Sequence, residues 1–82
     1  GAGKVPAPTP SEDYNGYTIR ATPYAEAGQY QMCGEIEREI DGVKKLHRFI
    51  RADRFASEED AVTFTFAKAR QIVDLNGDRM FG

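Results

Sequence analysis

Residues 29–53 read QYQMCGEIEREIDGVKKLHRFIRAD, and this stretch decides the fold of the chain. Two runs of alternating polarity, 29–40 and 43–53, flank the pair Asp41-Gly42. Asp-Gly between such runs is typical of a two-residue β-hairpin turn, because both turn positions need a positive φ and glycine adopts one without strain. We therefore predict a long antiparallel hairpin centred on this pair.

A two-residue turn also fixes which residues lie opposite each other, and so which side chains share a face. One face is formed by the pairs Ile40–Val43, Arg38–Lys45, Ile36–His47, Gly34–Phe49 and Met32–Arg51, with Tyr30 continuing it. The other face is formed by Glu39–Lys44, Glu37–Leu46, Glu35–Arg48 and Cys33–Ile50. The first face is the more apolar, so we predict that it packs on the core, with the Phe49 ring covering Gly34.

Shorter signals on either side of the hairpin complete the predicted fold. Residues 17–22 alternate in polarity and predict a strand that ends at Pro23, followed by a turn at 25–28. Ser57 is expected to cap a helix that runs to about Leu75, with Asn76-Gly77 at its C-terminus. Its apolar stripe is Val62, Phe66, Ala69, Ile72 and Val73. The sequence thus predicts an α+β fold, a three-stranded antiparallel β-meander packed against one C-terminal α-helix.

Length and composition limit the organisation and the setting of the chain. Its 82 residues suffice for one small domain. We predict a disordered proline-rich tail at 1–13 and a single α+β domain at 14–82. A single cysteine cannot form an internal disulfide and favours a reducing, cytoplasmic setting. The net charge is only -2 and no apolar run could span a bilayer, so no membrane partner is expected.

The sequence offers few groups for catalysis or metal binding. Cys33 and His47 are the one cysteine and the one histidine, and the hairpin register places them on opposite faces. That separation excludes a nucleophile–base dyad, and a metal ion normally needs three or four ligands. We therefore expect no enzyme activity, no cofactor and no metal.

Three glutamates at two-residue spacing, Glu35, Glu37 and Glu39, suggest a divalent-cation site. Lys44 and Arg48 occupy the neighbouring strand on the same face. We therefore interpret the glutamates as one side of an exposed ladder of ion pairs.

Two surfaces are candidates for interaction. Cys33, Leu46 and Ile50 form an apolar patch on the face predicted to be open. Met80-Phe81 or Tyr14 is expected to cover it, or else it binds a protein partner or a second copy of the chain.

The second surface is the basic segment 47–54. Three cations, Lys44, Arg48 and Arg54, are candidate nucleic-acid contacts on the open face, although the adjacent glutamates present mixed charge to a phosphate.

Several segments resemble a known family when taken in order: YNGYTI at 14–19, EIDG at 39–42, HRFIRAD at 47–53 and GDRMF at 77–81. They are similar to the HlyU family of small proteobacterial proteins, described as transcriptional activators of haemolysin. The resemblance implies transcriptional regulation and DNA binding. It also draws attention to Arg51, Asp53, Asp78 and Arg79, which we interpret either as a polar recognition cluster or as an ion-pair clamp between the C-terminal tail and the sheet.

Our functional hypothesis is a small non-enzymatic regulatory module that acts through protein contacts. The alternative is a transcriptional activator that binds DNA directly with the open sheet face and the segment 47–54. A helix-turn-helix reader needs a second helix, and the sequence predicts only one.

Overall fold

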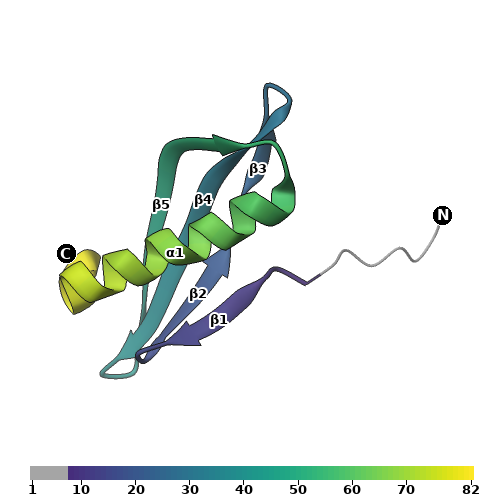
Figure 1. Ribbon diagram of the computed structural model, residues 1–82. Coiled ribbons are helices and arrows are strands. Elements are labelled where there is room, and N and C mark those ends of the chain that lie inside the picture. The colour runs from purple at the N-terminus through teal and green to yellow at the C-terminus, as the bar shows by residue number, and fades with distance from the viewer. Residues whose placement is uncertain (1–7) are drawn as a thin grey trace.

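A single helix lies across one face of a five-stranded antiparallel sheet in the computed structural model, which describes residues 8–82 (Figure 1). The strands are β1 (Ser11–Tyr14), β2 (Tyr17–Ala21), β3 (Tyr24–Glu26), β4 (Gln29–Ile40) and β5 (Val43–Phe55). The helix α1 spans Glu58–Asn76 and is followed by a short 3-10 helix, η1, at Gly77–Phe81. The α+β class and the single C-terminal α-helix are confirmed, whereas the sheet has five strands where we predicted three.

Three two-residue turns join neighbouring strands, and each ends in glycine. They are Asn15-Gly16, Ala27-Gly28 and Asp41-Gly42, and all six residues have positive φ. This is the geometry that matches the twist of a tight antiparallel hairpin. The hairpin at Asp41-Gly42 is confirmed, with Ile40 opposite Val43 and the predicted register kept as far as Cys33 opposite Ile50.

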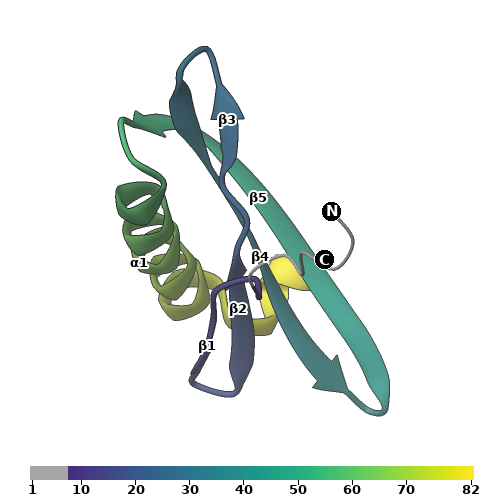
Figure 2. The ribbon, with the colours of Figure 1, turned by 90° about the vertical axis from the view of Figure 1, so that its right-hand side faces the viewer.

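β4 is the central strand of the sheet. β5 pairs with one of its edges, while β2 and β3 follow one another along the other edge (Figure 2). Thr22-Pro23 separates β2 from β3, since proline has no N–H to donate to a ladder. β1 pairs with the outer edge of β2. The residues 11–13 that we assigned to the tail are therefore part of the sheet, and 1–7 lie outside the described residues.

The predicted pairing of Met32 with Arg51 is wrong. Cys33 lies opposite Ile50 but Gln31 lies opposite Arg54, so β5 contains two extra residues at this point. Such a bulge bends the strand, and β5 turns sharply beyond it (Figure 1). Met32 still faces the core, where it is only 4% exposed.

The core lies between α1 and the helix-facing side of the sheet. Ile19 and Ile36 are completely buried there, and the remaining core side chains are Tyr17, Met32, Phe49, Ala69, Ile72 and Val73. Gly34 is the point of closest approach: a Cβ atom added there would lie 2.7 Å from Thr65 Cγ2 and 2.8 Å from Phe49 Cζ. The predicted packing of Phe49 over Gly34 is confirmed, and the missing side chain is what allows α1 to approach β4.

The helix begins and ends where predicted. The Ser57 hydroxyl accepts a hydrogen bond of 3.1 Å from the Asp60 N–H, and Gly77 follows the helix with a φ of 53°. Its buried face differs in part from our prediction, because Ala61 and Thr65 are buried in addition to the three predicted residues Ala69, Ile72 and Val73. Val62 and Phe66 are only half-buried. Small side chains occupy the contact because the helix lies so close to Gly34.

Candidate functional surface

The face of the sheet that points away from α1 is open in the described structure, and Arg20 lies near its middle. The Arg20 guanidinium donates to Glu35 at 2.6 Å and to Glu37 at 2.8 Å. Arg20 lies opposite Glu35 in the β2–β4 register, and Glu37 is two residues further along β4. One guanidinium can therefore reach both carboxylates. Its hydrogen bond lowers the pKa of Glu37 below the usual value.

The predicted ion-pair ladder between the glutamates and β5 is wrong in its partners. Glu35 does lie opposite Arg48, and Glu39 opposite Lys44, as the turn required. The carboxylates of Glu35 and Glu37 nevertheless bind Arg20, because its fork satisfies both at once. The cations on β5 are left without these two carboxylate partners.

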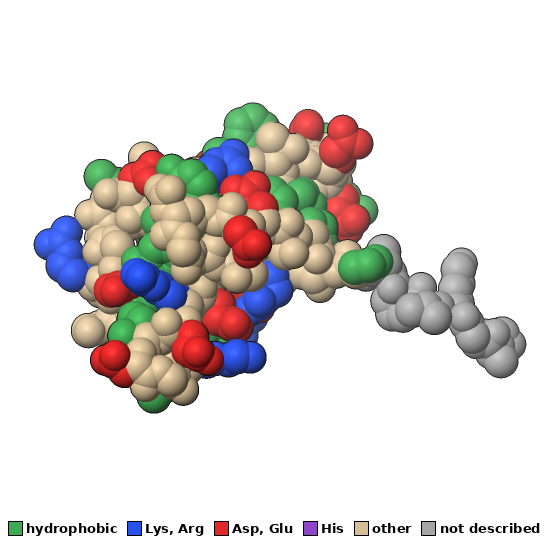
Figure 3. All heavy atoms as spheres, turned by 90° about the horizontal axis from the view of Figure 1, so that it is seen from below, with side chains coloured by type: hydrophobic (Ala, Val, Ile, Leu, Met, Phe, Trp, Pro, Cys, Tyr) green, Lys and Arg blue, Asp and Glu red, His purple; other side chains and the backbone are tan. Residues whose placement is uncertain are grey.

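β5 carries a marked excess of positive charge. Its five cations are Lys44, Lys45, Arg48, Arg51 and Arg54, and its one carboxylate is Asp53. Among residues 8–82, none of these five cations lies within 4.0 Å of a carboxylate oxygen. Elsewhere the surface is mixed: acidic and basic side chains alternate on the face in Figure 3. β5 is thus a basic strand on a chain whose net charge is -2.

Apolar side chains alternate with the cations of β5. Leu46 is 50% exposed and Ile50 is 57% exposed, and both lie on the open face. Cys33, the third member of the predicted patch, is buried, and its sulfur accepts a hydrogen bond of 3.3 Å from the Thr22 hydroxyl. The exposed part of the patch therefore consists of Leu46 and Ile50.

The predicted cover for this patch is wrong. Tyr14, Met80 and Phe81 pack against the core cluster on the helix side of the sheet. The ring centroids of Phe81 and Tyr17 lie 6.2 Å apart. The three side chains are drawn there because the core offers more apolar surface than the open face does. Leu46 and Ile50 remain exposed.

A polar cluster joins the C-terminal segment to the sheet, with different partners from those predicted. Arg38 Nη1 donates to Asp78 Oδ1 at 2.8 Å, the Tyr17 hydroxyl donates to the same oxygen, and the Arg38 guanidinium lies 5.0 Å from the Tyr17 ring centroid. The hydrogen bond from Tyr17, and then the one from Arg38, lower the pKa of Asp78. Burial, followed by the bond to Asp78, raises the pKa of Tyr17.

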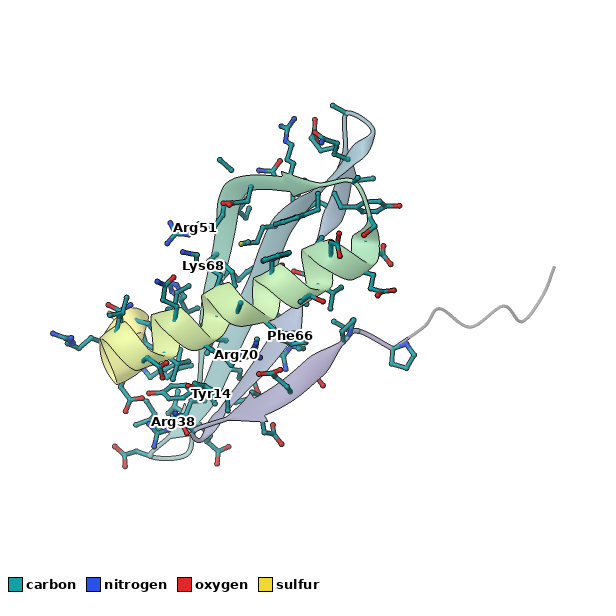
Figure 4. All side chains as sticks on the ribbon, viewed as in Figure 1. Tyr14, Arg38, Arg51, Phe66, Lys68 and Arg70 are labelled. Atoms are coloured by element: carbon teal, nitrogen blue, oxygen red, sulfur yellow. The ribbon has the colours of Figure 1, made fainter. Side chains whose placement is uncertain are left out.

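The four residues proposed as a clamp do not come together. Arg51 and Asp53 are exposed on β5, and Arg51 lies far from Arg38 (Figure 4). Arg79 donates to the backbone carbonyls of Leu75 and Asn76 at the end of α1. Of the two C-terminal residues, Asp78 contacts the sheet, and its partners there are Tyr17 and Arg38 and not Arg51.

The other predicted groups are also separate. His47 stacks on Phe49 with 6.5 Å between ring centroids on the helix-facing side, whereas Cys33 is on the opposite face. Across residues 8–82, no three His, Cys, Asp or Glu side chains gather as a metal-binding group. Arg54 donates to the Gln31 side chain beyond the bulge, which sets it apart from Lys44 and Arg48.

A shallow hollow of about 340 Å³ lies beside β2 at the start of α1. It is lined by Pro8, Thr9, Pro10, Ala21, Thr22, Pro23, Glu58 and Val62. Its lining combines three polar side chains, Thr9, Thr22 and the one charged residue Glu58, with proline, alanine and valine.

A family model described as "Transcriptional activator HlyU" matches residues 1–81. The chain belongs to the HlyU family. The resemblance inferred from the ordered segments is thereby confirmed, and the family is one of transcriptional regulators. No curated protein and no solved structure matches this HlyU-family chain. In the part of the chain that the structure describes, no helix is long and apolar enough to cross a membrane.

Sequence reasoning missed two residues of this HlyU-family protein that organise its polar surface, Arg20 and Arg38. Arg20 sits on a strand predicted from its alternation, but its neighbours depend on the β2–β4 register, for which no turn gave a signal. Arg38 was placed correctly on the core-facing side, opposite Lys45. Its partner Asp78 is 40 residues away and is reached only through the packing of α1.

Proposed function

We propose that this HlyU-family regulator is a small non-enzymatic module of the cytoplasm that binds another protein with the open sheet face and β5. The observation that supports this proposal is the alternation of half-exposed apolar residues, Leu46 and Ile50, with Lys44 and Arg48, which have no carboxylate partner in the described part of the chain. Protein interfaces combine an apolar centre with charges that select the partner. β5 offers both along one strand.

Transcript measurements in the native cell test the proposal. The gene is deleted, the transcripts that change are identified, and the strain is complemented with the wild-type chain or with Leu46→Gln/Ile50→Gln. Both side chains are already half-exposed, so the variant keeps its fold. We expect it to fail to restore the transcripts, because an interface centre loses its apolar contacts.

The control is Leu75→Gln, which removes a side chain that is 66% exposed at the end of α1. It is expected to restore the transcripts fully. If Leu46→Gln/Ile50→Gln restores them equally well, the open face is not the functional surface.

Direct DNA binding is the second candidate, and it is favoured by the five cations of β5, none of which has a carboxylate partner among residues 8–82. Against it, a duplex that lies on the open face meets Glu35, Glu37 and Glu39 beside those cations. Gel-shift titrations with DNA upstream of the affected genes, over a series of salt concentrations, separate the candidates. Phosphate contacts produce a steep loss of affinity with salt, and we expect weak binding without sequence preference.

A further inference from the structure

The outer edge of β5 is the longest strand edge that is unpaired among residues 8–82. β5 pairs only with β4 in this part of the chain, and residues 43–50 run without a bulge. Such an edge presents backbone N–H and C=O groups with which another extended chain can pair. We infer that this edge binds an extended acidic segment of another protein as an added strand. The inference rests on the proposed function and specifies how the contact is made.

The register identifies the backbone groups that are available. A two-residue turn makes Ile40 and Val43 a hydrogen-bonded pair, and bonded and non-bonded pairs alternate along an antiparallel ladder. The N–H and C=O groups that point away from β4 therefore belong to Lys44, Leu46, Arg48 and Ile50. These are also the residues whose side chains lie on the open face, so one added strand meets both the backbone groups and the side chains.

Charge selects the occupant of this edge. An added strand lies about 4.8 Å from β5, with its side chains directly beside those of β5. Carboxylates would then stand next to Lys44 and Arg48 on the open face and next to Lys45 on the other. A second copy of β5 would instead bring these cations beside a strand with the same charge excess, and edge lysines are a common defence against such pairing.

An added strand also suits β5 better than a DNA duplex does. The carboxylates of Glu35, Glu37 and Glu39 lie on β4, one strand inward from β5. A strand added outside β5 is separated from β4 by two strand spacings, about 10 Å, and contacts the cations first. A duplex resting on the sheet face would contact the carboxylates as well.

Amide hydrogen exchange followed by NMR tests the inference directly. The probe is a synthetic peptide of about nine residues in which Glu and Val alternate, a pattern that suits an extended strand. In the free protein we expect the amides of Lys45, His47 and Phe49, which point toward β4, to exchange slowly and those of 44, 46, 48 and 50 to exchange fast. A saturating amount of peptide is expected to slow the second set by at least about tenfold, since exchange reports loss of backbone access.

Matched controls separate backbone pairing from charge attraction. A peptide of the same sequence with an N-methyl group on every backbone amide keeps its charge but loses the donors of both strand edges, and it is expected to leave the four amides fast. Lys44→Gln/Arg48→Gln is expected to weaken peptide binding by about tenfold, whereas Lys68→Gln/Arg79→Gln, with the same change in charge, changes it less than about twofold.

Four results would overturn the inference. One is that the peptide does not bind at up to about 1 mM. Another is that it binds while the four amides stay fast. A third is protection of these amides in the free protein that grows with protein concentration, which assigns the edge to a second copy. The last is that a short DNA duplex protects them better than the peptide does. The transcript experiment with Leu46→Gln/Ile50→Gln judges the proposed function separately from all four.

Discussion

The two faces of the sheet are built from the same alternating strands, yet they differ completely in what covers them. Ile36 on β4 is fully buried beneath α1, whereas Ile50 on β5 is 57% exposed on the other side. Alternation creates two faces, but the position of the single helix decides which one becomes the core. Gly34 and Thr65 allow that helix to lie close to β4 on one side only, and the second face remains available for contacts with other molecules.

Truncating one isoleucine on each face tests whether the two faces differ in burial. Ile36→Ala leaves a cavity in the core and is expected to reduce the free energy of unfolding by about 2–5 kcal/mol. Ile50→Ala is expected to change it by less than about 0.5 kcal/mol, because the side chain is already exposed. Urea denaturation measures both values. Equal losses would mean that the open face is covered in solution.

If Ile36→Ala does not fold, Ile36→Val preserves the test. This substitution removes one methylene group and is expected to reduce the free energy of unfolding by about 0.5–1.5 kcal/mol.

A side chain at Gly34 tests the close approach that makes one face the core. Gly34→Ala places a Cβ atom 2.7 Å from Thr65 Cγ2, and the overpacking is expected to cost about 1–3 kcal/mol. Thermal denaturation with circular dichroism detects the loss. Combining it with Thr65→Ala removes the clashing methyl group, so the double variant is expected to lose less than the sum of the two single variants. Strict additivity would contradict the contact.

Removing the buried hydroxyl of Thr65 is expected to change the free energy of unfolding by a smaller amount and in the opposite direction. Its Oγ1 atom is buried, and no atom of residues 8–82 forms a hydrogen bond with it. Thr65→Val keeps the shape of the side chain and removes this unpaired group, so the free energy of unfolding is expected to rise by about 1 kcal/mol. Urea denaturation of the variant beside the wild-type chain measures it. A loss of stability would show that the hydroxyl is hydrogen-bonded in solution.

Acid titration probes one polar cluster on each side of the sheet. The pKa values of Asp78 and Glu37 are both lowered in the fold, chiefly by hydrogen bonds from Tyr17 and Arg20 respectively. A carboxyl group with a lowered pKa stabilises the fold above its ordinary pKa, and this contribution is lost as the pH falls through the folded value. We expect stability to fall on acidification below the ordinary values of 3.8 and 4.5.

Asp78→Asn and Glu37→Gln remove these titrations one at a time. Each is expected to flatten the acid limb of the stability curve slightly, as measured by chemical denaturation at a series of pH values. If neither variant alters the loss of stability at low pH, that loss is due to other carboxyl groups.

Local signals made much of the fold predictable. Asp41-Gly42 determined the register from Ile40–Val43 to Cys33–Ile50, and Ser57 and Gly77 marked the ends of α1. Asn15-Gly16 was an equally local signal for the β1–β2 hairpin, and it was present in the sequence but not used. The turn predicted at 25–28 does contain Ala27-Gly28, but Ala25 and Glu26 belong to β3, which the prediction lacked.

The remaining features depend on contacts between distant residues. No glycine or other turn residue in the sequence marks the bulge in β5 between Ile50 and Arg54. Arg20 binds two glutamates only because β2 docks on β4 in one particular register. The open surface was therefore predicted in outline, as the face that carries Leu46 and Ile50, whereas the charges left unpaired on it could be known only from the structure.

The two ends of the folded domain are fastened to each other. Glu12 binds Arg70 at 2.7 Å, Tyr14 binds Asp74 at 2.9 Å, and Tyr17 binds Asp78, so three bonds connect the first hairpin to the end of α1 and the start of η1. Each of them spans roughly sixty positions of an 82-residue chain. Arg70 and Asp74 precede Leu75, so deleting the residues after Leu75 would remove only the bond to Asp78. A cut before Arg70 would remove all three partners of the first hairpin at once.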